Sequence, residues 1–388
     1  MPSRVPSVVV VVSAVLGLSG PASAGGSPTL EGSPETVFAS AVDGCAAWDI
    51  PDTPARAWRG ADGLVRLVSG SEESRALVGP SLDDVRRACP VLYRGGGADD
   101  PGAHDDRAWI HATYVEGDRV TALAHVEYHG HLRPGVCAST DYAACWRNAI
   151  VELRSDDGGR GFRRTGTVAV LPYRYTGDEG RRSGYFNPSN ILRRGDFLYV
   201  FVFAEALGAQ RRGACLLRRP VDGGPADWRA WDGRGFGVRF ADPDAVVVDD
   251  PARHVCMPLA GLASTISSVV ESTARGGFLA VTAATLRDTD GVPRAGVYST
   301  TSPDLLRWSR PRLLWEVPLL WRRDCAAPAA YAYPALLDAD SPSANLETVD
   351  DRFWLYLVRM PLDDGCRAGR SRDLIRVPVS WPAPGDPR

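Results

Sequence analysis

One structural unit recurs along the chain, and this repetition limits the possible folds more than any other feature of the sequence. Each copy has a strand, a tight Gly/Asp turn, a second strand, a polar loop and a third strand. The second strands begin at Leu64, Thr121, Phe197, Phe278 and Phe353, which gives steps of 57, 76, 81 and 75 residues. A period of several tens of residues predicts a repeat architecture.

The composition of these units predicts an all-β fold. Short runs rich in Val, Leu, Tyr, Phe and Trp alternate with Gly, Asp, Asn and Pro, and no long amphipathic helix interrupts them. The fifth unit ends at Trp381 without an obvious fourth strand, while residues Thr36 to Val42 precede the first unit. A closed ring removes the exposed edges that one large sheet would have. We therefore predict a five-bladed β-propeller with about four antiparallel strands per blade, closed by an N-terminal strand.

The N-terminus has the pattern of an export signal. Arg4 precedes an apolar run from Val8 to Leu18, and Ala22, Ser23 and Ala24 form an A-x-A cleavage site. Residues 1–24 are thus predicted to be a signal peptide, and residues 25–388 one propeller domain. We expect a secreted, extracellular or periplasmic protein. The apolar run is shorter than the roughly 20 residues that cross a bilayer, so no membrane anchoring is expected.

Eight cysteines in an exported chain indicate disulfide bonds. Cys137 and Cys145 are the safest predicted pair because they lie close enough to close one loop, whereas spacing alone leaves the other pairs open. Without Arg4, 43 basic residues face 47 acidic ones. This mildly acidic balance argues against a nucleic-acid partner. We expect a monomer.

The topology of a propeller selects candidate site residues. The innermost strand of each blade starts, and the second strand ends, at the same face of the ring. First-strand starts offer Asp49, Asp52, His111, Asn187, Asn190, Tyr331 and Tyr333, and second-strand ends offer Glu127, His129, Glu205 and Arg359. Carboxylates, amides and aromatic rings suit a polyhydroxylated ligand. An oligo- or polysaccharide is therefore the predicted partner.

Two turns after third strands resemble propeller signatures. Ser155, Asp157, Gly159 and Phe162 are similar to the sialidase Asp-box, S-x-D-x-G-x-T-W, and Ser302, Asp304 and Trp308 resemble a shorter turn of five-bladed glycoside hydrolases. In such a turn the Asp carboxylate caps backbone N–H groups of a hairpin. We expect both turns to be structural and to lie opposite the active site.

The opening WDIPDTPARAW resembles that of the arabinanase/β-xylosidase and invertase/levansucrase groups of five-bladed glycoside hydrolases. The resemblance implies that Asp52 is a catalytic base or nucleophile. Those families place their general acid, a Glu, where this chain has Asn187, and Asn cannot donate a proton as a carboxylic acid does. Glu127 is the best replacement and Glu205 the next, since glycoside hydrolysis needs two carboxyl groups.

Three hypotheses follow from these residues. The first is a secreted glycan-active hydrolase that cleaves glycosidic bonds with paired carboxylates in the axial pocket. The second is a catalytically inactive glycan-binding propeller, which the Asn at position 187 favours. The third is a metal-dependent propeller enzyme, since His125, Glu127 and His129 share one face of a strand, and His131 follows them. No cofactor is expected under the first hypothesis, and a structural Ca²⁺ in the axial channel is an alternative use of the centre.

Overall fold

A computed structural model describes residues 26–288 and 290–382 of the chain. The predicted signal peptide, residues 1–24, lies outside the described residues. The described part is an all-β fold whose strands form four hydrogen-bonded sheets, and its only α-helix is the short α1 (Ser40–Asp43). Short 3₁₀ turns occur at η1 (Pro101–Ala103), η2 (Gly130–Leu132), η3 (Tyr142–Cys145), η4 (Pro225–Asp227) and η5 (Pro251–His254). Among the described residues no helix has the length and apolar character needed to cross a membrane.

The first two sheets contain the strands of the first three sequence units. One sheet has the order β3-β4-β5-β6, with β3 (Arg56–Arg59), β4 (Val65–Val68), β5 (Ala76–Ser81) and β6 (Asp84–Arg87). The second contains β7 (Arg107–Glu116), β8 (Arg119–His129), β9 (Trp146–Ser155), β10 (Arg163–Ala169), β11 (Ser183–Phe186), β12 (Leu192–Arg194), β13 (Phe197–Glu205), β14 (Gly213–Pro220) and β15 (Arg229–Ala230). Its two halves, β7–β10 and β11–β15, are antiparallel, and a short parallel pairing of β11 with β9 joins them into one hydrogen-bonded sheet.

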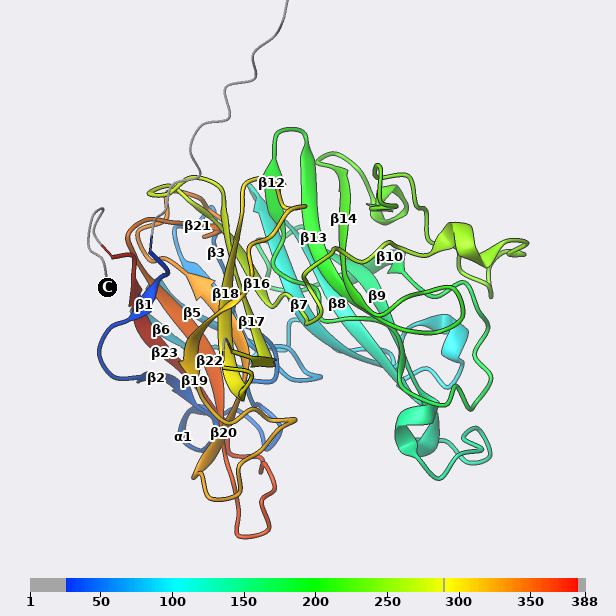
Figure 1. Cartoon of the computed structure of the whole chain (residues 1–388), viewed down its shortest axis with the longest axis horizontal. Helices are drawn as coiled ribbons and strands as arrows, with labels where there is room; N and C mark the ends of the chain where they lie inside the picture. The colour runs from blue at the N-terminus through cyan, green and yellow to red at the C-terminus, as the bar shows by residue number, and fades with distance from the viewer. Residues whose placement is uncertain (1–25, 289, 383–388) are drawn as a thin grey trace, which may run out of the picture.

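The other two sheets contain the fourth and fifth units. One has β16 (Ser268–Ser272), β17 (Phe278–Arg287), β18 (Pro293–Ser302), β19 (Arg312–Glu316) and β21 (Thr348–Val349). The other has β20 (Ala329–Leu337), β22 (Arg352–Pro361), β23 (Asp373–Ser380), β1 (Thr29–Leu30) and β2 (Glu35–Ala39). The N-terminal β1 and β2 both pair antiparallel with the C-terminal β23, and Figure 1 shows these three strands side by side. The strand expected between Thr36 and Val42 thus forms, but it ends at Ala39 because α1 follows.

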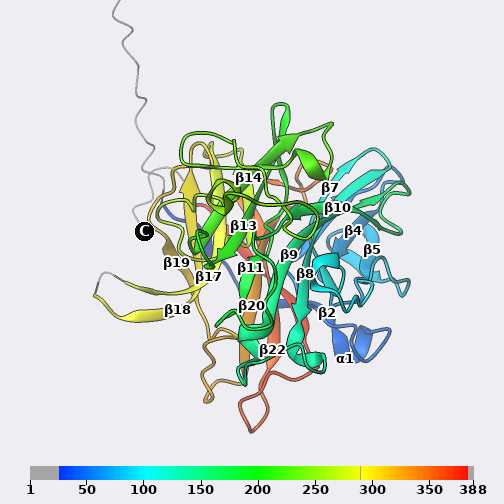
Figure 2. The ribbon, with the colours of Figure 1, turned by 90° about the vertical axis from the view of Figure 1, so that its right-hand side faces the viewer.

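Five hydrophobic cores lie between neighbouring units in the described part of the chain. One joins β3–β5 to β7–β9 through Trp58 and Ile110, and the next three follow in sequence order. The fifth core joins the last unit to the first, with Leu67 packed in the same cluster as Tyr356. Figure 2 shows β4 and β5 beside β7 and β8, in agreement with the contact between β3 and β7. Middle strands such as β8 and β13 are buried on both faces, which explains their nearly continuous apolar sequences.

The described residues contain four disulfide bonds, of which one joins a strand, β14, to a loop. Cys137 pairs with Cys145, which confirms the prediction, and the other pairs are Cys45–Cys89, Cys215–Cys256 and Cys325–Cys366. Each of these three closes a loop of more than 40 residues. Loop closure of this kind stabilises a folded domain by about 2–4 kcal/mol per bond.

The turn after β9 has the hydrogen bonds expected of a capped hairpin. The Asp157 carboxylate accepts backbone N–H groups from Arg160 at 2.9 Å and Gly161 at 3.2 Å, and the Ser155 hydroxyl accepts the N–H of Gly159 at 2.9 Å. Asp304 accepts two N–H groups in the same way after β18. Side-chain caps of this kind hold a turn by occupying donors that its backbone cannot pair.

Replacing Asp157 by Ala will lower the free energy of unfolding by about 1–2 kcal/mol, because two backbone N–H groups lose their acceptor. Urea denaturation will measure the change. Asp156→Ala is the matched control, since the exposed Asp156 side chain contacts only the guanidinium groups of Arg154 and Arg163; it will change stability by less than about 0.5 kcal/mol. Equal effects of the two substitutions would contradict this explanation of the turn.

Candidate functional site

A cavity of about 660 Å³ lies among strand ends from several units. Its wall includes His125 and Glu127 from β8, Asn187 directly after β11, and Tyr333 from β20. Trp146 and Tyr142 add aromatic surface, and Tyr142 lies in the loop that the Cys137–Cys145 disulfide closes. Of the candidates taken from strand ends, Glu127, Asn187 and Tyr333 come from three different units and lie together on this wall.

Glu127 is held between two histidines on one face of β8. Its Oε2 atom lies 2.9 Å from Nε2 of His129, and its Oε1 atom lies 3.8 Å from Nδ1 of His125. Alternate residues of a strand point to the same side, which brings these three side chains together. The Glu127 side chain is only 16% exposed. Burial raises the pKa of Glu127, and the nearby charges of His125, Arg107 and Arg182 oppose this shift.

Asn148 fixes the tautomer of His125. The Asn148 amide donates to the carbonyl of Ser183 at 3.1 Å, so its Oδ1 atom faces His125 Nε2 at 2.9 Å and also accepts the Trp146 indole N–H. His125 must then donate from Nε2, which leaves the lone pair of Nδ1 facing Glu127 when the ring is neutral. Burial lowers the pKa of His125 and keeps this neutral form.

His111 lies below His125 rather than on the cavity wall. The two imidazole rings meet edge to face with their centroids 5.5 Å apart, and His111 is buried. Burial lowers its pKa well below the usual value, and the charge of His125 and of Arg56 acts in the same direction. The neutral His111 ring therefore supports His125 from within the core.

Asp52 reaches the same group of residues from the loop before β3. It forms an ion pair with Arg372, and its side chain is 23% exposed. Burial raises the pKa of Asp52 to about 6; the charge of Arg372 lowers it, and the charge of Glu127 raises it. The nearby Tyr333 hydroxyl also lowers the pKa of Asp52. Asp52 and Glu127, 75 positions apart in the sequence, are thus electrostatically coupled.

Two cavity residues have unusual backbone conformations. Tyr333 has φ = 59° at a register shift within β20, and Asn187 has φ = 50°. A left-handed conformation is uncommon for residues other than glycine, especially bulky ones, and costs of order 1–3 kcal/mol. The irregular strand turns the Tyr333 side chain toward Asp52, where burial and the Asp52 charge raise its pKa well above the usual value. Tyr333 therefore remains a protonated hydrogen-bond donor.

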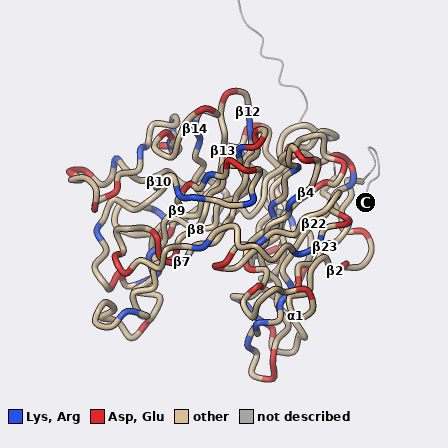
Figure 3. Tube along the Cα trace, turned by 180° about the vertical axis from the view of Figure 1, so that it is seen from behind, with Lys and Arg blue, Asp and Glu red and all other residues tan. Residues whose placement is uncertain are grey.

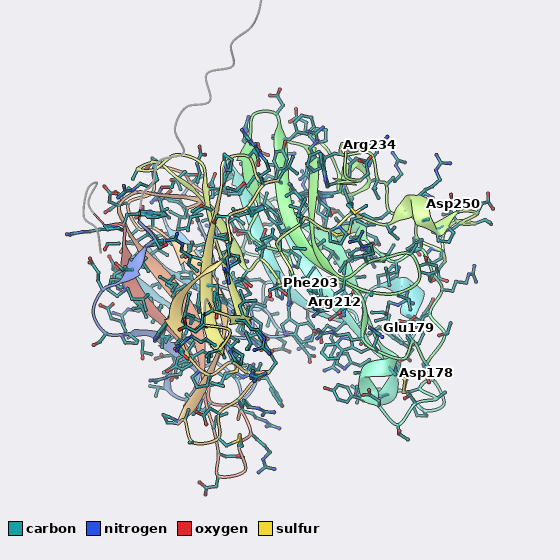
Figure 4. The ribbon with its side chains drawn as sticks, viewed as in Figure 1. Asp178, Glu179, Phe203, Arg212, Arg234 and Asp250 are labelled. Atoms are coloured by element: carbon teal, nitrogen blue, oxygen red, sulfur yellow. A yellow bond between two sulfur atoms is a disulfide. The ribbon has the colours of Figure 1, made fainter. Side chains whose placement is uncertain are left out.

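Glu205 lies behind two arginines of the cavity wall. Its carboxylate accepts one hydrogen bond from Arg182 and one from Arg212, both at 2.9 Å. The Arg182 guanidinium lies over the rings of Phe186 and Trp146, and the Arg212 guanidinium lies 4.8 Å from the Phe203 ring centroid. Figure 4 shows Phe203 and Arg212 close together near the middle of the molecule. Glu205 thus orients two cationic side chains.

The remaining candidates do not line the cavity. Asp49 pairs with Arg87 at 3.2 Å, and Arg359 pairs with Asp373 at 2.6 Å. The Asn190 amide bonds to both backbone groups of Val269, and Tyr331 packs against Trp315. Sequence reasoning missed Asn148, Arg182, Arg212 and Arg372, because their roles depend on loops that bring distant segments together. Of these four residues, only Arg182 had a signal in the sequence, namely the pair of arginines Arg181–Arg182 just before β11.

The alternative metal ligands His125, Glu127 and His129 do not converge on a common point. His125 Nε2 is bound to Asn148, and His129 Nε2 is bound to Glu127. His131 lies in η2, beyond the end of β8. Within residues 26–288 and 290–382, no group of three or more His, Cys, Asp or Glu side chains is arranged to hold a metal ion. The described residues therefore contain no set of side chains that supports the metal hypothesis.

Several solved structures that align with this chain are glycoside hydrolases. An α-L-arabinanase of Cellvibrio cellulosa complexed with arabinohexaose aligns over 84% of this chain and 91% of its own, with 11% identity and a TM-score of 0.44. An exo-1,5-α-L-arabinanase from a bovine ruminal metagenomic library (9% identity, 84% and 95% covered, TM-score 0.43) and a glycosyl hydrolase of Bacteroides ovatus (9%, 84% and 83%, 0.44) also align. No protein-family model and no curated protein sequence matches the chain. At these values the likeness concerns the fold and carries no information about activity.

Proposed function

We propose that this chain is an exported glycan-active hydrolase that cleaves glycosidic bonds, with Glu127 as general acid and Asp52 as base or nucleophile. The observation that carries the proposal is the electrostatic coupling of Glu127, which lies on the wall of a cavity with aromatic side chains, to Asp52, which is half-buried and does not itself line that cavity. Glycoside hydrolysis uses one protonated and one ionised carboxyl group. Burial favours the protonated form of Glu127, while Arg372 stabilises the ionised form of Asp52.

We further propose that residues 25–388 form one five-bladed β-propeller and that the protein acts as a monomer. Five cores between successive units, including one between the last unit and the first, support this architecture. The pairing of β2 with β23 supports closure of the ring by the N-terminal strand. Four disulfide bonds are consistent with an oxidising compartment outside the cytosol.

A glycan-binding protein without catalysis is the second candidate. Asn187 lines the cavity at the position where a Glu acid would open the third blade, and its amide can bind hydroxyl groups but cannot protonate a leaving group. The purified mature protein should be tested against plant and bacterial polysaccharides and aryl glycosides, with release of reducing sugar or chromophore as the readout. Release supports the hydrolase; a glycan that raises the melting temperature without release supports the binding protein instead.

The activity of the hydrolase will depend on pH through Asp52. Because the base or nucleophile must be ionised, kcat/KM will rise with pH through about 6, the pKa of Asp52.

Ionisation of Asp52 has the opposite effect on the stability of the fold, which falls as the pH rises. The folded-state pKa lies above the ordinary 3.8, so the contribution of Asp52 to stability is complete below pH 3.8 and is lost as the pH rises through about 6. Rate profiles and urea unfolding between pH 4 and 8 will measure both trends, and a rate independent of pH from 5 to 7 would contradict the role of Asp52.

A further inference from the structure

The cavity wall is more basic than the rest of the protein. The whole sequence has a formal net charge of −3, and Figure 3 shows acidic and basic residues interspersed along the trace. The wall, in contrast, contains the arginines Arg182, Arg212 and Arg322, and its one carboxyl group among the described residues is Glu127. The sign of the local charge is therefore reversed at the candidate active site.

Arg182 and Arg212 are held in place and remain accessible. Each forms one hydrogen bond to the single Glu205 carboxylate, so one negative charge faces two guanidinium groups. Aromatic rings support the flat faces of both, which limits their motion without occupying their N–H groups. The Arg182 side chain is 34% exposed and that of Arg212 is 57% exposed, whereas Glu205 is 10% exposed. A ligand in the cavity meets the guanidinium groups rather than the carboxylate.

The neighbouring titratable groups do not cancel this positive charge. Burial raises the pKa of Glu127, which reduces its negative charge, and lowers that of His125. The Asp52 carboxylate is paired with Arg372. Glu72 and Asp106 also face this region, but they pair with Arg107 and Arg133. The excess of guanidinium groups on the wall thus remains.

Arg322 adds a third cation from a separate segment. It ends a tight turn in which Leu319 and Arg322 exchange backbone hydrogen bonds, and the exposed Trp321 precedes it on the same wall. The planar guanidinium fork matches the oxygen geometry of carboxylate and sulfate groups and binds them with two parallel hydrogen bonds. Arginines from two sides of one cavity suit a ligand that carries such groups on a sugar ring.

We propose that the ligand of this cavity is an anionic glycan, whose carboxylate or sulfate groups are bound by Arg182, Arg212 and Arg322. This inference rests on the proposed function, because it names the substrate class of the same site. The aromatic rings would contact the sugar faces while the guanidinium groups bind the acidic substituents. Neutral glycans of the same length lack the groups that these arginines recognise.

The test is direct binding, which does not depend on turnover. Calorimetric titrations of the mature protein should use oligosaccharides of one length: a polyuronate, a sulfated glycan and a neutral arabinan. We expect at least one of the two anionic ligands to bind about tenfold tighter than the neutral one at low salt, with a smaller difference at high salt. Comparison of the polyuronate with the sulfated glycan distinguishes a carboxylate from a sulfate ligand.

Paired substitutions locate the effect. Arg182→Gln and Arg322→Gln will each weaken binding of the anionic ligand by about tenfold, which is more than either substitution weakens binding of the neutral ligand. Their neighbours Arg181 and Arg323 are exposed and do not line the cavity, so Arg181→Gln and Arg323→Gln are matched controls. Arg322 is exposed, so its substitution tests the proposal even if loss of Arg182 disturbs the fold.

The outcomes separate this inference from the proposed function. Neutral glycans that bind as tightly as both anionic ones, or are hydrolysed in preference to them, would overturn the inference. The proposed hydrolase function would not be affected. Anionic glycans that bind through these arginines without being cleaved would support the inference and contradict the proposed hydrolase function. Equal effects of Arg322→Gln and Arg323→Gln would show that the charge acts non-specifically and would also overturn the inference.

Discussion

Replacing Glu127 by Gln will lower kcat on a cleaved glycan by about 10²- to 10⁴-fold, the usual contribution of a positioned general acid. The Gln side chain has the same shape and can still hydrogen-bond to His129, but it cannot donate a proton to the leaving oxygen. Substrate binding should change little, because the substitution removes no aromatic or arginine side chain from the cavity wall. Steady-state kinetics on the substrate found in the polysaccharide screen will measure kcat and KM separately.

Glu347→Gln is the matched control for this substitution. Burial raises the pKa of Glu347 as it does that of Glu127, but its carboxyl group bonds to the Ser343 hydroxyl and does not line the cavity. The control should retain full activity. A Glu127→Gln protein with a normal melting temperature and a normal kcat would show that Glu127 is not the general acid. Another carboxyl group would then have to supply the proton.

Much of the fold could be predicted from the sequence because local patterns encode it. The predicted second strands at Thr121, Phe197 and Phe278 correspond to β8, β13 and β17, since each begins after a turn and continues as a run of buried residues. The pairing of residues near Thr36 with β23 followed from counting strands in the last unit. Repetition supplied information that no single segment contains.

The site could be predicted only in part, because residue type does not reveal the partner of a polar side chain. Glu127 and Glu205 both lie at the end of a second strand. Glu127 faces the cavity between two histidines, whereas the Glu205 carboxylate accepts hydrogen bonds from two arginines. Asp52 owes its environment to Arg372, which is 320 positions away. Such long-range pairs depend on how the units pack, and one sequence carries no direct signal of them.

Removing the side chain of Arg56 will destabilise the protein by about 3–5 kcal/mol, because several buried carbonyl oxygens lose their donor at a cost of about 1–3 kcal/mol each. The Arg56 guanidinium lies among the innermost strands, where it donates to the carbonyl groups of His111 at 2.6 Å, Ser267 at 2.5 Å and Ala55 at 3.0 Å. These carbonyls belong to or precede first strands of three units. Burial lowers the pKa of Arg56, and among its described hydrogen-bond partners no carboxylate compensates its charge.

Arg56→Ala leaves these buried carbonyl oxygens without donors and leaves a void at the centre, so both effects add to the loss. Arg56→Lys will be less damaging than Arg56→Ala, because its ammonium group retains the charge and some donors. It will still lower stability, because one ammonium group cannot reach carbonyls in several directions at once. Arg86→Ala, at an exposed position of β6, is the control and should change stability by less than about 0.5 kcal/mol. Guanidinium denaturation will measure all three. A loss below about 1 kcal/mol for Arg56→Ala would mean that the hydrophobic cores between the units, rather than this central hydrogen-bonded group, hold the first strands together.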